Sequence, residues 1–128
     1  MKRLLAASGI TTALGFWLFL HAQAPASADS RLWHYRNLGK AFYENPTTQK
    51  DAVEQFRQAL ALAPRSAREQ VNYGLSLLRA GDVENGVAEL EKAKKTDPKL
   101  PYTWFNLGVT FQKQGEFDRA TAEFQQMV

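Results

Sequence analysis

Hydrophobic and polar positions follow the period of an amphipathic helix along most of this 128-residue chain. Apolar or small residues recur at i, i+3, i+4 and i+7, a spacing that places them on one face of a helix. The clearest stretch contains Trp104, Leu107, Gly108 and Phe111. A second kind of helix face carries Ala52, Phe56, Ala59 and Ala63. The pattern therefore predicts an all-α chain.

The two kinds of face recur at a nearly constant interval. Gly39, Gly74 and Gly108 stand 35 and 34 residues apart. Each unit also places a small residue four positions before a bulky one, in the pairs Ala52 and Phe56, Gly86 and Leu90, and Ala120 and Phe124. A fixed interval of about 20 to 50 residues is typical of stacked structural repeats. Because small residues let antiparallel helices approach closely, the recurrence predicts three nested helical hairpins.

Local signals mark the ends of these helices. Ser66 and Glu69 have the S-x-x-E spacing of an N-terminal capping box. Gly81 and Gly115 follow the first helices of the second and third hairpins, where a left-handed C-cap is expected. Pro101 can occupy the first turn of its helix without losing a hydrogen bond. The boundaries thus agree with the repeat.

The repeated pattern resembles the tetratricopeptide repeat, whose units of about 34 residues read W-x2-L-G-x2-Y, then A-x3-F, then P. The best copy has Trp104, Leu107, Gly108 and Phe111, followed by Ala120 and Phe124, and Pro64 and Pro98 close the first two units. The resemblance covers the chain from about Leu32 to the end. It implies an α-α superhelix of about three hairpins, with an array at 29–128 and units near 32–65, 66–99 and 100–128.

Individual units depart from the family pattern. The first has one extra residue in the loop at 45–47, and the second has Gln70 where a large apolar residue is usual. Gly86 replaces the usual alanine, which costs about 1 kcal/mol of helix propensity. Met127 replaces a late alanine of the third unit. These departures weaken single units but leave the register intact.

The third unit stops inside its second helix. A stack needs a polar element over its last hydrophobic face, so we expect Phe117, Phe124 and Met127 to be partly uncovered. We favour the interpretation that the sequence is a fragment of a longer protein. The alternative is that this end docks onto a partner.

The first 28 residues have the layout of a secretory signal peptide. Lys2 and Arg3 form a short positive region, residues 4–20 are apolar and uncharged, and residues 21–30 are small and polar. The leader predicts an exported protein, periplasmic or extracellular. The alternative is an uncleaved membrane anchor, although an apolar stretch interrupted by Gly, Ser and Thr is short for a span of about 20 residues.

Charge and composition narrow the function classes. After residue 28 the chain holds 14 Lys or Arg against 13 Asp or Glu, a net charge of +1, so the high overall pI is not evidence of a nucleic-acid surface. The chain has no cysteine, which excludes disulfides, thiolate nucleophiles and zinc–thiolate sites.

Few side chains are suited to catalysis. His34 is the only histidine after the leader, and we interpret it as a surface residue at the start of the first helix. The repeat glycines are explained by helix crossing and not by a phosphate loop. Solvated helix faces and the helix dipole account for the clustered charges Glu89, Glu91, Glu116, Asp118, Lys92, Lys94 and Lys95. We therefore expect no enzyme activity, no cofactor and no metal.

In tetratricopeptide repeat proteins the first helix of each hairpin lines a concave groove. The resemblance implies that the groove residues lie beside the apolar residue–Gly pair, with a few others on the same helices. In this chain they are Arg36, Asn37, Lys40, Arg68, Val71, Asn72, Leu75, Arg79, Tyr102, Phe105, Asn106, Val109 and Lys113.

Three of these groove residues, Asn37, Asn72 and Asn106, share one repeat position and are expected to form a ladder along the groove. An amide both donates and accepts, so a ladder could pair with a peptide backbone without reading its sequence. The equal alternative is that asparagine is simply common at this position of the family. With Tyr102 and Phe105 adding apolar contact and the basic residues forming a positive rim, the expected ligand is a partly apolar, mildly acidic segment.

The leading hypothesis is an exported protein-interaction module that binds a protein or peptide, without nucleic acid, and with a membrane only if the leader is kept. One alternative is a membrane-anchored assembly factor with the same groove. Another is the N-terminal recognition part of a longer exported enzyme. The sequence leaves the partner and the oligomeric state open.

The leader interpretation predicts a processed N-terminus. Ala26 and Ala28 give the small-x-small signature that signal peptidase requires, which places cleavage before Asp29. Mass spectrometry of the exported protein should therefore find a mature chain that begins at Asp29. Exported protein that still begins at Met1 would contradict cleavage and favour the anchor.

Overall fold

The computed structural model describes residues 27–127, and all regular structure in that range is helical. Its helices are α1 (Ala28–Glu44), α2 (Gln49–Leu62), α3 (Ala67–Arg79), α4 (Val83–Thr96), α5 (Pro101–Lys113) and α6 (Phe117–Gln125). The predicted signal peptide, residues 1–28, lies outside the described residues except for Ser27 and Ala28. The leader and its boundary with the array therefore stay predictions.

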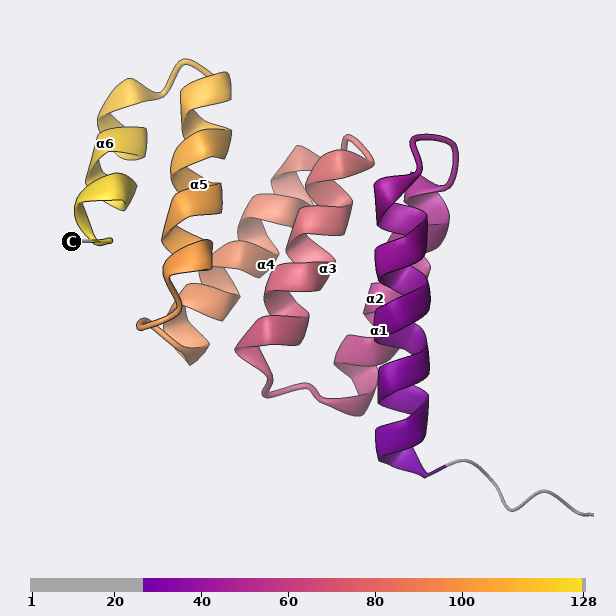
Figure 1. Cartoon of the computed structure of the whole chain (residues 1–128). Coiled ribbons are helices and arrows are strands. Elements are labelled where there is room, and N and C mark those ends of the chain that lie inside the picture. Colours follow the sequence, from indigo (N-terminus) through magenta and orange to yellow (C-terminus); the bar gives the residue numbers. More distant parts are fainter. Residues whose placement is uncertain (1–26, 128) are drawn as a thin grey trace, which may run out of the picture.

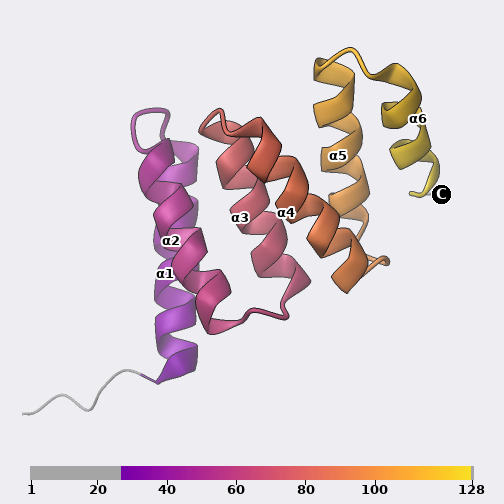
Figure 2. The ribbon, with the colours of Figure 1, turned by 180° about the vertical axis from the view of Figure 1, so that it is seen from behind.

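Consecutive helices form three antiparallel hairpins, α1–α2, α3–α4 and α5–α6, which stand side by side (Figure 1). Helices α2 and α4 lie behind α1 and α3 in Figure 1 and in front of them in the reverse view of Figure 2. In the first two hairpins, α1 and α3 thus form one layer and α2 and α4 another. The predicted all-α superhelix of helical hairpins is confirmed.

In the first and third hairpins the helices cross where one of them has no side chain. Gly39 on α1 faces Phe56 on α2, and a Cβ atom at Gly39 would lie 2.9 Å from the nearest ring carbon. Gly108 on α5 faces the ring of Phe124 on α6 with even less room. Because Cβ atoms in proteins essentially never come within 3.0 Å of another atom, the glycines are needed for the crossing. The predicted close approach is confirmed.

The second hairpin crosses glycine against glycine. A Cβ atom at Gly86 on α4 would lie 2.7 Å from Cγ of Leu78 and 3.0 Å from the backbone oxygen of Gly74, both on α3. From the sequence, Gly86 was interpreted as a weak substitute for alanine, and the structure corrects that interpretation. The loss of helix propensity is offset by the close packing of α3 against α4, which a methyl group at this position would prevent.

Helices α3 and α5 end in the predicted left-handed caps. Gly81 has φ 90° and Gly115 has φ 79°. After α3, the N–H of Gly81 donates to the carbonyl of Leu78 at 3.2 Å and the N–H of Asp82 to that of Leu77 at 2.9 Å. This is the Schellman arrangement, which satisfies the last carbonyls of the helix.

The loop after α1 has no glycine and is organised by side chains instead. Oδ1 of Asn45 accepts hydrogen bonds from the backbone N–H of Thr47 at 3.0 Å and from its hydroxyl at 2.8 Å. The hydroxyl of Thr48 donates to the carbonyl of Phe42 at 2.9 Å, which covers an end group of α1. The extra residue of the first unit is accommodated here.

The predicted capping box before α3 is only half formed. The hydroxyl of Ser66 accepts from the N–H of Glu69 at 3.3 Å. The carboxylate of Glu69 does not return to the backbone of Ser66, because it pairs with Arg36 on α1. The first turn of α3 is therefore held to the preceding hairpin through this side chain.

The main apolar core lies between the second and third hairpins. Its buried members are Val71, Leu90, Ala93, Leu107, Phe111 and Ala120, with Leu75, Leu78, Val87, Leu100 and Phe124 packed against them. The expectation that Val71 faces the groove was wrong, since this side chain is buried in the core.

Within residues 27–127 the outer face of the third unit is partly uncovered, as expected. Phe117 is 65% exposed and Met127 is 42% exposed, whereas Phe124 is half-buried against Gly108. Phe105 packs against Phe124 with ring centroids 6.3 Å apart and is itself exposed.

Candidate protein-interaction groove

Two adjoining hollows lie along the first helices of the hairpins. The first hollow has a volume of about 420 Å³ and is lined by Arg36, Lys40, Tyr43, Glu44, Phe56, Arg68, Asn72 and Leu75. The second hollow has a volume of about 250 Å³ and is lined by Tyr43, Leu75, Leu78, Arg79, Val83, Asn106, Val109, Thr110, Lys113 and Gln114. Because Tyr43 and Leu75 line both, we call the two hollows together the groove.

Most of the residues that the sequence placed in the groove line these hollows. They are Arg36, Lys40, Arg68, Asn72, Leu75, Arg79, Asn106, Val109 and Lys113. Asn37, Tyr102 and Phe105 line neither hollow. The groove also contains residues that the sequence did not indicate, namely Tyr43, Glu44, Phe56, Leu78, Val83, Thr110 and Gln114.

One repeat position has different surroundings in each hairpin, although Arg36 lines the first hollow as expected. Arg36, Val71 and Phe105 stand at this position, three residues before the crossing glycine. Arg36 bonds to Glu69 of the next hairpin, and Val71 is buried in the core shared with the third hairpin. Phe105, which lies on the last hairpin that the structure describes, is 47% exposed. The position therefore faces the next unit of the stack more than the groove.

The pair of Arg36 and Glu69 links the first two hairpins. Nε of Arg36 donates to Oε1 of Glu69 at 2.9 Å, and Nη2 contacts the same oxygen. The Glu69 side chain is fully buried, whereas that of Arg36 is 21% exposed and also lies over the ring of Trp33, 5.0 Å from its centroid. Arg36 thus lines the first hollow with its charge already neutralised.

Positive charge that is not paired gathers in the groove. Lys40, Arg68, Arg79 and Lys113 line it with a single carboxylate, Glu44, which gives a net charge of +3. None of the four cations forms an ion pair with a carboxylate of residues 27–127. The described chain carries only +1 in total, so its remaining surface is net negative. The groove is therefore the electropositive face.

Aromatic and amide groups complete the lining. The guanidinium of Arg79 lies over the ring of Tyr43, 4.8 Å from its centroid, where the hollows meet. Nδ2 of Asn72 donates to Oε2 of Glu69 at 3.4 Å, and Nδ2 of Asn106 donates to the carbonyl of Tyr102 at 2.6 Å. Both amides keep Oδ1 as an acceptor. Asn37 is exposed outside the hollows, so the groove does not contain all three asparagines of the expected ladder.

A second polar link joins the last two hairpins away from the groove. Nζ of Lys94 on α4 lies 2.9 Å from Glu91 on the same helix and 2.9 Å from Glu123 on α6, and it sits over the ring of Trp104 on α5. Burial opposes the charged form of Lys94, but the bonds to Glu91 and Glu123 outweigh it and raise the pKa of this amine. Lys94 therefore acts in hairpin packing, beyond the helix-dipole role expected from the sequence.

No cluster suited to metal binding accompanies the groove. His34 is exposed and packs edge-on against Tyr35, with ring centroids 5.5 Å apart. Residues 27–127 contain no group of three or more His, Asp or Glu side chains that could hold a metal ion. Over the same range, no helix combines the length and the apolar character needed to cross a membrane.

Comparison with known proteins agrees with this architecture. The family model described as Tetratricopeptide repeat matches residues 50–101. The Vi polysaccharide export protein VexE of Salmonella typhi is 28% identical over 95 residues, which cover 72% of this chain and 14% of VexE. This chain thus spans only a small part of that relative.

Two solved structures share the fold. The MamA RS-1 ArsTM double mutant superposes with a TM-score of 0.68 at 21% identity, over 75% of this chain and 53% of that one. A crystal structure of MamA gives 0.67 at 22% identity, over 79% and 56%. This chain therefore spans about half the length of both.

The stacked hairpins and the groove along their first helices define a helical-repeat solenoid. Residues 50–101 match the tetratricopeptide repeat family, and the hairpins on both sides of this segment continue the same fold.

The link between the first two hairpins predicts a large effect of Glu69. In Glu69→Ala, Arg36 loses its buried partner, and the free energy of unfolding should fall by about 2–4 kcal/mol. Replacing both residues by leucine should recover most of that loss, because no charge is then left without its partner. Urea unfolding followed by circular dichroism measures both values. A double variant as unstable as Glu69→Ala would contradict the role of the pair.

Proposed function

We propose that this chain is a protein-interaction module that binds an acidic, partly apolar polypeptide segment along the groove and carries out no catalysis. The observation that carries the proposal is the set of four cations without carboxylate partners in a groove that also exposes Leu75 and Val109. A negatively charged segment would be attracted to this face, and its apolar side chains would cover the apolar lining.

The form of the groove favours a polypeptide as the ligand. Two hollows that adjoin at Tyr43 and Leu75 suit an extended or helical chain better than a single small molecule. The free Oδ1 atoms of Asn72 and Asn106 can accept from backbone N–H groups of such a chain. Tetratricopeptide repeat proteins generally bind protein partners, which agrees with this assignment.

We further propose that the module acts outside the cytoplasm. The leader at residues 1–28 supports this location. VexE, which is 28% identical to this chain over 95 residues, is by name a polysaccharide export protein. A partner within an export apparatus is therefore a reasonable first target.

Reversal of groove charge provides the test. The full chain is immobilised, partners from the exported fraction are captured and identified, and the affinity of each purified partner is measured. Lys40→Glu combined with Lys113→Glu should weaken a groove-bound partner at least tenfold, because two attractions become repulsions. Both side chains are exposed and lack ion-pair partners among residues 27–127, so helicity should not change.

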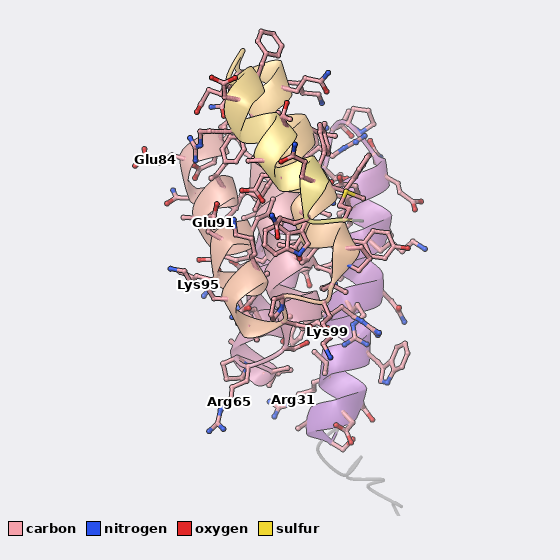
Figure 3. All side chains as sticks on the ribbon, turned by 90° about the vertical axis from the view of Figure 1, so that its left-hand side faces the viewer. Arg31, Arg65, Glu84, Glu91, Lys95 and Lys99 are labelled. Carbon is pink, nitrogen blue, oxygen red and sulfur yellow. The ribbon has the colours of Figure 1, made fainter. Side chains whose placement is uncertain are left out.

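The matched control applies the same charge change away from the groove. Arg65 and Lys95 are exposed, and Figure 3 shows Arg65 and Lys95 pointing outward from the ribbon. Arg65→Glu combined with Lys95→Glu should leave the affinity within about twofold. A partner that both double variants weaken equally, or that neither weakens, would contradict binding in the groove.

A further inference from the structure

We propose that the first hollow is an anchor pocket for one bulky apolar side chain that is directly flanked by carboxylates. This inference rests on the proposed function, since it names the part of an acidic partner that the first hollow would take. It fixes where along the groove such a partner sits. Neither the repeat pattern nor the family match assigns this subsite.

The size and lining of the first hollow argue for a bulky side chain. Its volume of about 420 Å³ falls within the roughly 300–1,000 Å³ of ligand pockets, whereas the second hollow, at about 250 Å³, is smaller. Its apolar lining comes from Phe56, Tyr43 and Leu75 on three different helices. The ring of Phe56 is held in place by the crossing at Gly39, so this wall is preformed.

The charged residues of the first hollow argue for carboxylates next to that side chain. Lys40 comes from α1 and Arg68 from α3, and both are exposed and unpaired within residues 27–127. Arg36 adds little, because Glu69 already neutralises it. Glu44 also lines the hollow, so Lys40 and Arg68 leave it with a net charge of +1. Two cations from separate helices can therefore bind two carboxylates, one before and one after the anchor residue.

The backbone of the anchor residue also finds a partner. Asn72 lines the same hollow, and its Nδ2 is engaged by Glu69. The remaining Oδ1 can accept a backbone N–H of the bound segment. The second hollow is lined by more amide and hydroxyl groups, from Asn106, Thr110 and Gln114, and is less suited to an apolar anchor.

Three labelled peptides test the pocket with the full chain. They share Gly-Ser flanks and differ only at the centre, which reads Asp-Phe-Asp, Asn-Phe-Asn or Asp-Ala-Asp. Fluorescence anisotropy should show binding of the first peptide, with at least tenfold weaker binding of each of the others. Loss of the ring removes the buried area, and loss of the charges removes the attraction to Lys40 and Arg68.

A charge reversal locates the binding in the first hollow. Arg68→Glu should weaken the Asp-Phe-Asp peptide at least tenfold and should strengthen a Lys-Phe-Lys peptide relative to the unaltered chain. Arg65→Glu, three residues away and outside the groove, is the control and should change neither affinity by more than about twofold. Circular dichroism of both variants checks that the helices are intact.

The outcomes separate this inference from the proposed function. Equal binding of the three peptides, or equal effects of Arg68→Glu and Arg65→Glu, would overturn the anchor pocket. If no peptide binds but a captured partner still depends on Lys40 and Lys113, the anchor pocket is wrong and the groove proposal stands. If the captured partner is also insensitive to those charges, both fail.

Discussion

The close crossing of paired helices is the constraint on which the rest of the structure depends. In the first and third hairpins a phenylalanine ring lies against a glycine of the facing helix, at Gly39 and at Gly108. In the second hairpin, Gly74 and Gly86 bring the two backbones together while Leu78 and Leu90 fill the space beside them. Dispersion and apolar burial at these contacts require atoms within van der Waals distance, so a single added methyl group changes the geometry of the pair.

The hairpins are joined to one another by different means along the stack. An apolar cluster connects the second and third hairpins, and Lys94 adds an ionic link on the side away from the groove. The first and second hairpins share the buried pair of Arg36 and Glu69 instead. Because that pair lies beside the first hollow, the same contact that fixes the spacing of the hairpins also shapes the groove and removes one cation from it.

Much of the fold followed from the sequence, because helical periodicity, glycine caps and repeat spacing are local signals. The caps at Gly81 and Gly115 are marked by their own helix ends, and the crossing at Gly39 follows from the repeat interval. The groove was harder to predict. A helical register gives the face on which a residue lies, but the tilt between successive hairpins decides whether that face meets the groove or the next unit. Val71 was misplaced for this reason.

The sequence-based prediction also failed where one side chain could bond to either of two groups. Glu69 has the spacing of a capping residue, yet it pairs with Arg36, which lies 33 positions earlier in the sequence. Tyr43 and Phe56 were missed in the groove because the family pattern places groove residues around the repeat glycine of the first helix. The spacing of Arg36 and Glu69, almost one full repeat, was the available signal for their contact.

The most direct test of the crossing compares two separate substitutions on α4, glycine to alanine at the crossing and alanine to glycine at an exposed position. Gly86→Ala should lower the free energy of unfolding by about 1–2 kcal/mol. The added methyl group would overlap Leu78 and approach the backbone of Gly74, and the energy of this steric conflict exceeds the gain in helix propensity. Ala88→Gly, at an exposed position of the same helix, should lower it by about 1 kcal/mol through propensity alone. Denaturant unfolding of both variants measures the difference. A Gly86→Ala protein more stable than the unaltered chain would contradict the requirement for close crossing.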